Sequence, residues 1–136
     1  MADFNELNDK LNETVTELAN TKDTTPEYDP QDIQANKGMA VLAYLGILVL
    51  IPLLGAKESK FARFHVNQGL ILAVIEIIIW VAVRALGWIP VVGWILRIAR
   101  WIISVICLIL AIIGIMNAAK GEAKELPFIG GIWILR

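Results

Sequence analysis

The chain has one cysteine and one histidine among its 136 residues, and both numbers limit its chemistry. A single Cys107 allows neither an intrachain disulfide nor a cysteine-based zinc site, and fits a small apolar core residue. One imidazole, that of His65, is not a metal site. Nucleophile-elbow, zincin, Walker and dinucleotide-binding patterns are also absent. We therefore predict no enzymatic activity, no metal and no cofactor.

Charge is scarce in three long stretches. Residues 39–56 contain no charged side chain, 69–88 contain only Glu76 and Arg84, and 101–119 contain none. Each stretch has about the length that a helix needs to cross a hydrocarbon core of about 30 Å. The sequence predicts an all-α integral membrane bundle with three transmembrane helices over these ranges.

The first part of the chain differs in charge from the rest. Residues 1–38 hold nine acidic residues and three lysines, whereas the remainder holds nine basic and four acidic residues. We divide the chain into an acidic soluble tail, 1–37, and a transmembrane domain, 38–136. The opening residues lack the features of a secretory signal, so the first span is expected to direct its own insertion. The sequence has no basic patch with interleaved aromatic residues, so we do not expect nucleic-acid binding.

The tail contains an amphipathic pattern followed by a linker. Phe4, Leu7, Leu11 and Leu18 recur at helical spacing and predict a short amphipathic helix. Two prolines in residues 21–30 predict a linker. Two interpretations of the helix stay open: it lies on its own membrane domain or frays in water, or it binds a partner.

Several short segments are predicted to lie at the membrane surface. Residues 57–68 are too polar to cross, and their cations either contact lipid headgroups or only fix the topology. Residues 86–94 predict an interfacial turn with tryptophan anchors. Residues 126–136 are too short to span as a helix, so they are interfacial, re-entrant or packed on the bundle. The candidate headgroup contacts are Lys57, Lys60 and Arg63.

Three spans would place the two ends of the chain on opposite sides of the membrane. Six bases then face four across the bilayer, and the positive-inside rule places the 57–65 loop and the C-terminus inside and the acidic tail outside. The six are Lys57, Lys60, Arg63, Lys120, Lys124 and Arg136, and the four are Lys37, Arg84, Arg97 and Arg100.

Glu76 is the strongest functional signal, because an ionisable group within an apolar span is energetically costly. His65, Gln68 and Glu76 fall within roughly 80° of one another on a helix, which predicts an intramembrane polar stripe. Glu76 is a structural carboxyl or ion-pair partner, handles protons or cations, or contacts a partner subunit. His65 is expected to cap a helix or to contact headgroups.

The third span carries a complementary face. Arg97, Arg100 and Ser104 are spaced by three and four residues, and we expect them to pack against the second span, antiparallel after Pro90. Arg84, Arg97 or Arg100 would pair with Glu76 if that carboxyl is ionised.

Two segments carry a family resemblance. They are the run from Ala43-Tyr44-Leu45-Gly46 to Ser59-Lys60-Phe61-Ala62-Arg63-Phe64-His65-Val66-Asn67-Gln68-Gly69-Leu70, and the close from Ala118-Ala119-Lys120-Gly121 to Glu125-Leu126-Pro127-Phe128-Ile129-Gly130. Over about residues 38–130 they resemble the bacterial relatives of Tic-twenty, the chloroplast inner-envelope import component. The resemblance implies an all-α membrane domain of three or four helices and, for most relatives, an unknown function. Plant relatives are associated with a protein-conducting complex, and some bacterial relatives with organelle-like membranes such as magnetosomes.

These observations favour a scaffold or assembly component of a bacterial cell membrane, whose partners are the bilayer and either another protein or further copies of itself. The alternative is an oligomeric transport component or ion or proton conduit that uses the stripe of His65, Gln68 and Glu76.

Overall fold

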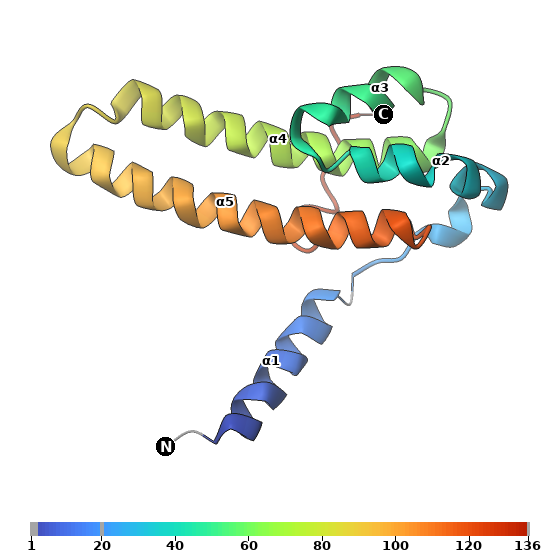
Figure 1. The fold of residues 1–136 in the computed structure, drawn as a ribbon, viewed down its shortest axis with the longest axis horizontal. Helices are drawn as coiled ribbons and strands as arrows, with labels where there is room; N and C mark the ends of the chain where they lie inside the picture. Colours follow the sequence, from blue (N-terminus) through green and yellow to red (C-terminus); the bar gives the residue numbers. More distant parts are fainter. Residues whose placement is uncertain (1–2, 20, 136) are drawn as a thin grey trace.

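The computed structural model describes residues 3–19 and 21–135, and every regular element in this part of the chain is helical (Figure 1). One isolated bridge joins Asp23 to Lys124. The all-α prediction is therefore confirmed. The elements are α1 (Phe4–Ala19), η1 (Thr25–Glu27), α2 (Pro30–Leu42), η2 (Gly46–Val49), α3 (Leu50–Gly55), α4 (Lys60–Leu86) and α5 (Pro90–Ala119), where η marks a 3₁₀ helix.

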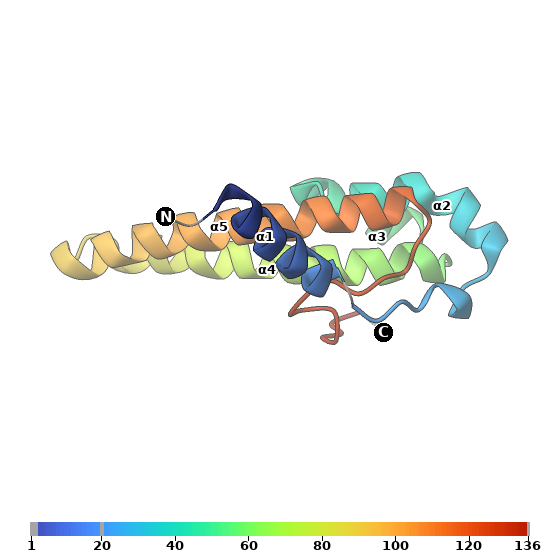
Figure 2. The same ribbon diagram turned by 90° about the horizontal axis from the view of Figure 1, so that it is seen from below.

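Helices α4 and α5 form a long antiparallel hairpin that organises the bundle (Figures 1 and 2). The proline at the first turn of α5 needs no hydrogen-bonded N–H, so Pro90 begins the helix without cost. The backbones meet closely at the turn, because a Cβ added to Gly93 would lie 2.2 Å from the Gly87 oxygen. Among the described residues, these are the two helices long and apolar enough to cross a membrane.

The predicted first span is wrong, because residues 39–56 do not form one helix. Helix α2 ends at Leu42, and the chain then turns back through η2 and α3 beside α4 (Figure 1). Gly46 takes a φ of 65°, a left-handed conformation that glycine adopts without strain, and Pro52 lacks the N–H that a long helix would need. Two long helices and a folded-back segment replace the expected three spans. Helix α2 also runs through the predicted boundary at residues 37 and 38.

The two ends of the bundle differ, and we call them the base and the tip. At the base, the linker before α2 is joined to the chain after α5: the Thr24 N–H donates to the Ala123 oxygen at 3.0 Å, and the Glu125 N–H donates to the Lys22 oxygen at 2.9 Å. The tip is the turn of residues 87–89. The linker and the C-terminal segment therefore lie at the same end of the hairpin, and not at opposite ends as three spans would require.

Helix α1 stands away from the bundle (Figure 1). The predicted amphipathic helix is confirmed, but it does not lie on its own membrane domain. Phe4, Leu7 and Leu11 on its apolar face are 72%, 51% and 54% exposed. The core lies instead at the base, where α2, α4 and α5 bury Phe61 and Phe64 of α4.

The C-terminal segment packs on the bundle over the described residues 126–135, as one of the three alternatives predicted. Asn67 of α4 donates to the Ile132 oxygen at 2.8 Å and accepts from the backbone N–H groups of Ile134 and Leu135 at 2.7 and 3.0 Å. The Trp133 ring lies edge-on to Phe64, with 5.9 Å between centroids. Arg136, which we had placed with the inner bases, lies outside the described residues.

Asp32 of α2 fixes the start of α4 at the base. Its Oδ2 accepts from the Phe61 N–H at 3.0 Å, while Ser59 caps the same helix through the Ala62 N–H at 3.0 Å. Burial by itself raises the pKa of Asp32, but hydrogen bonds from the Ser59 side chain and the Phe61 backbone outweigh it. The pKa of Asp32 therefore lies below its ordinary value of 3.8.

We expect Asp32→Ala to lower the free energy of unfolding by about 1 kcal/mol at pH 7, as for the loss of a helix cap. Because the folded pKa of Asp32 is lowered, its contribution is present above about pH 4 and is lost as the pH falls through the folded pKa. Thermal unfolding in detergent at several pH values measures both effects. Asp32→Asn is the matched control and should keep most of the stability at pH 7 while losing the pH dependence. Equal stability of Asp32→Ala and the wild type would contradict the capping role.

Candidate functional site

A buried polar cluster joins three parts of the chain at the base. Tyr44 follows α2, whereas His65 and Gln68 lie one turn apart on α4, and all three side chains are almost fully buried. The Tyr44 hydroxyl lies 2.6 Å from His65 Nδ1 and 2.6 Å from Gln68 Nε2. His65 Nε2 lies 3.0 Å from the Glu122 oxygen, and the Leu126 N–H donates to Gln68 Oε1 at 2.8 Å.

The proton positions in this cluster follow from what each atom can donate. The Gln68 amide has hydrogens to donate, so the Tyr44 oxygen accepts from it and directs its own hydrogen to His65 Nδ1. The Glu122 carbonyl only accepts, so His65 carries its hydrogen on Nε2. Every group has a partner in this arrangement, and the imidazole is neutral.

The surroundings hold the cluster rigidly. The His65 ring meets Phe61 and Phe64 edge-on at centroid distances of 4.9 and 5.1 Å. A Cβ added to Gly114 would lie 2.3 Å from the Tyr44 ring, and one added to Gly69 would lie 1.9 Å from the Ala43 oxygen. Glycine at these positions lets the turn after α2 enter between α4 and α5.

The structure places His65 differently from the predicted helix cap or headgroup contact. Its side chain is buried and bonded within the bundle, and Ser59 caps α4 instead. His65 and Gln68 do come together, as the predicted stripe requires, but Glu76 lies about two turns further along α4. Apolar groove residues, Leu72 among them, separate it from the cluster.

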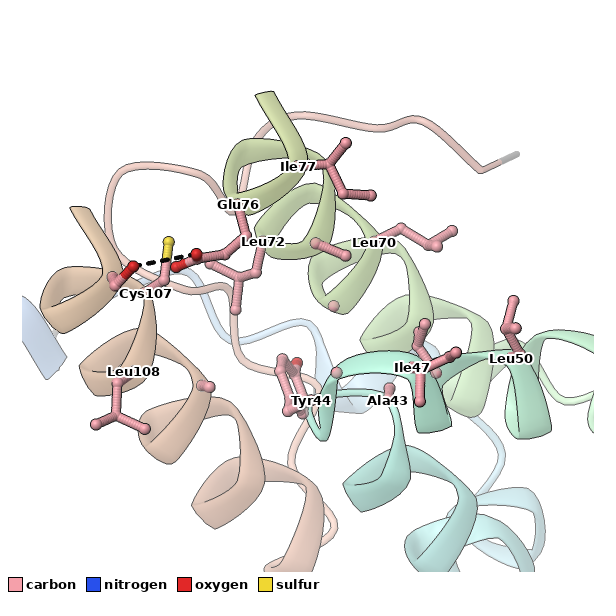
Figure 3. A pocket seen from close by; sticks show the side chains of 16 residues that line it. Ala43, Tyr44, Ile47, Leu50, Leu70, Leu72, Glu76, Ile77, Cys107 and Leu108 are labelled. Atoms are coloured by element: carbon pink, nitrogen blue, oxygen red, sulfur yellow. Dashed lines mark hydrogen bonds between the residues drawn. The ribbon is translucent and has the colours of Figure 1, made fainter. Parts of the chain in front are cut away.

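An apolar groove lies between the folded-back segment and the α4–α5 hairpin (Figure 3). Its volume is about 680 Å³. Tyr44, Ile47 and Leu50 line it from the segment that follows α2, and Glu76 and Leu108 line it from the long helices. Its lining is mostly apolar, and Tyr44, Glu76 and Ser104 are among the residues that contribute polar atoms.

Glu76 forms its hydrogen bond with α5 and not with an arginine. The Ser104 hydroxyl donates to Glu76 Oε2 at 3.1 Å, shown as the dashed line in Figure 3. Among the described residues, no ion pair joins Glu76 to Arg84, Arg97 or Arg100, so that alternative is not seen. The described residues also bring together no group of three His, Cys, Asp or Glu side chains that could hold a metal.

The predicted packing face of α5 is seen in part. Ser104 faces α4 through Glu76, but Arg84, Arg97 and Arg100 are exposed near the tip. Arg97 reaches back to the turn and donates to the Gly87 oxygen at 3.0 Å. At the base, Lys57 and Lys60 are exposed and Arg63 donates to the Lys57 oxygen at 3.3 Å, so their contact with headgroups stays a prediction.

Sequence reasoning missed three residues of the site. Tyr44 connects the two α4 side chains, Asn67 holds the C-terminal segment, and Asn117 donates to the Lys124 oxygen at 3.4 Å. The available signal was their polarity, since each lies within or beside an apolar run where a polar group needs a partner.

Known proteins match the chain over the bundle. The profile of the magnetosome magnetite crystal formation protein family matches residues 35–133. The magnetosome protein MamF of Paramagnetospirillum magneticum is 31% identical over 95 residues, covering 68% of this chain and 77% of that protein. The magnetosome protein MmsF of the same organism is 30% identical over 99 residues, covering 71% and 81%.

A further relative carries no magnetosome name. A UPF0132 membrane protein of Methanocaldococcus jannaschii is 36% identical over 94 residues, covering 68% of this chain and 63% of that protein. No solved structure matches the chain. The matches overturn the resemblance to the Tic-twenty relatives: residues 38–130 had been assigned to the wrong family, although the membrane character is confirmed.

The polar cluster gives a direct stability prediction. Tyr44→Phe removes the acceptor of Gln68 and the donor to His65, leaving two buried polar atoms without partners. Each such atom costs about 1–3 kcal/mol, so we expect a loss in this range or above it. Chemical unfolding in detergent, followed by circular dichroism, measures the loss. Tyr28→Phe, at the half-buried second tyrosine, is the control and should cost less; an equal cost would argue against a special role for Tyr44.

Proposed function

The chain belongs to the magnetosome magnetite crystal formation protein family, and on that premise we propose that it is a non-enzymatic scaffold that gathers other proteins on one face of a membrane. The observation that carries this proposal is α1, an amphipathic helix whose described apolar side chains Phe4, Leu7 and Leu11 are exposed. The family match begins at residue 35, so α1 lies outside the shared bundle. In this proposal the bundle anchors the chain in the membrane, and α1 binds the partner protein.

The bonding of the polar residues supports a scaffold over a conduit. His65 and Gln68 are committed to Tyr44 and to the backbone of the C-terminal segment, and they are closed off from solvent. A path for ions would need such groups to line water or a cavity. Glu76 is separated from them by the apolar groove, so the three residues do not form a continuous polar route.

Because two relatives are named magnetosome proteins, we extend this proposal to a magnetosome-like organelle membrane. The archaeal relative carries a matching segment under a name that states only a membrane location. We therefore propose a scaffold role for the bundle and α1, and we propose no role in mineral chemistry.

The arrangement of the base supports a topology with two crossings, by α4 and α5. The linker, the loop before α4 and the chain after α5 then share one side of the membrane. Among the described residues that follow α1, seven bases lie toward the base, against three near the tip, and the positive-inside rule places the base inside together with the acidic tail. The seven are Lys22, Lys37, Lys57, Lys60, Arg63, Lys120 and Lys124, and the three are Arg84, Arg97 and Arg100.

Single-cysteine reporters in a Cys107→Ala background test this topology. We expect Thr14→Cys and Glu58→Cys to react with a membrane-impermeant maleimide from the same side in sealed vesicles. Val91→Cys at the tip, which is 68% exposed as valine, should react from the opposite side. Reaction of Thr14→Cys and Glu58→Cys from opposite sides would restore a third crossing and contradict the proposal.

The recruiting role of α1 is tested by affinity purification in native detergent with mass spectrometry. Removing residues 1–19 leaves the linker of the base intact, and we expect it to abolish binding of a stoichiometric partner. Leu7→Ser with Leu11→Ser should do the same, because both side chains lie on the apolar face. Glu6→Gln with Glu13→Gln is the control and should retain the partner.

Two results would count against the scaffold. Co-purification of a partner that does not depend on α1 would contradict the recruiting role of this helix. Proton or cation flux in liposomes that Glu76→Gln abolishes at unchanged stability would favour the conduit instead.

A further inference from the structure

Beyond the tip-side end of the groove at Glu76 and Ser104, the same face of the hairpin continues toward the tip as a cationic surface. On α5, Arg100 and Arg97 lie four and seven residues before Ser104, and at about 100° per residue both fall within about 40° of it. On α4, Trp80 and Arg84 lie four and eight residues after Glu76, on the side of the groove. Three arginines therefore lie on the tip side of the apolar groove.

The arginines lie at the level where a bilayer core would end. Residues 101–119 contain no charged side chain and extend about 28 Å, close to the hydrocarbon thickness of about 30 Å. Lys120 follows this stretch at the base, and Arg100 precedes it toward the tip. Trp80 and Arg100 each lie about 6 Å beyond the hydrogen bond between Glu76 and Ser104, which places them at one level.

This surface is positively charged, and no acidic residue of the surrounding segment neutralises it. Residues 77–121 contain no acidic residue, and their cations near the tip are Arg84, Arg97 and Arg100. Arg84 lies over the Trp80 ring at 5.7 Å, and Arg97 is bonded to Gly87. Glu76 is the one acidic residue in the sequences of α4 and α5, and it lies deeper and accepts from Ser104.

We propose that the groove and these arginines form a binding site for one anionic phospholipid of the leaflet at the tip. An acyl chain occupies the apolar groove, and the phosphate lies between Arg84 and Arg100. A phospholipid has an anionic head followed by an apolar chain. The surface matches this sequence, because from tip to base the arginines come first and the apolar groove follows. A second copy of this chain would place arginines against arginines, so charge complementarity selects the lipid.

The first experiment needs no variant. Full-length protein is delipidated in a non-ionic detergent, and dioleoyl phosphatidylglycerol or dioleoyl phosphatidylcholine is added. We expect native mass spectrometry to show one phosphatidylglycerol per chain and the melting temperature to rise, with phosphatidylcholine binding at least tenfold more weakly. Glycerol phosphate, the head without a chain, should neither bind nor stabilise.

Two variants separate the head from the chain. Arg84→Gln with Arg100→Gln should weaken phosphatidylglycerol binding roughly thirty-fold, at about fivefold for each cation removed near an anionic phosphate. Ala73→Phe fills the groove and should also reduce binding. Lys22→Gln with Lys120→Gln removes the same charge at the base, at two exposed lysines, and should leave binding unchanged.

Three results would overturn the proposal. Equal binding of the two lipids would show an apolar groove without head recognition, and equal binding of glycerol phosphate would show an anion site without a chain. Loss of binding in the base control as large as in the arginine variant would show a general effect of net charge. The lipid comparison on the wild-type protein decides the matter even if a variant fails to fold.

Discussion

Peptide groups outside a helix need hydrogen-bond partners wherever water is excluded, and helix α4 supplies them in this protein. The turn after α2 and the chain after α5 are both irregular, and both pack against the first three turns of α4. Gln68 binds the Leu126 N–H, His65 binds the Glu122 carbonyl, and Asn67 binds three peptide groups of the C-terminal segment. The polar residues of α4 thus allow non-helical chain to lie within an apolar bundle.

This constraint explains why some features followed from the sequence and others did not. Hydropathy and length identified the apolar parts of α4 and α5, but both helices begin earlier than the predicted spans, α4 at Lys60 within a segment expected at the membrane surface and α5 at Pro90. The same criteria failed for residues 39–56. Their apolar length allowed a span, but the helix ends at Leu42, Tyr44 turns inward toward His65, and Gly46 takes a left-handed conformation.

The candidate site was predicted in part for a related reason. Helical spacing placed His65 and Gln68 on one face correctly, since that depends only on their own helix. Their partners, Tyr44 and the peptide groups of residues 122 and 126, come from segments 21 to 58 positions away. Spacing within one helix cannot reveal such partners, so a buried structural cluster was read as a membrane stripe.

The joined linker at the base determines how α1 is tethered. Helix α1 ends at Ala19, and hydrogen bonds to the C-terminal segment begin at Thr21, whose hydroxyl donates to the Glu125 oxygen. A tether this short keeps a bound partner near the membrane and makes it diffuse laterally with the bundle. Two such partners on neighbouring chains would meet in two dimensions at a high effective concentration, without affinity of their own for the bilayer.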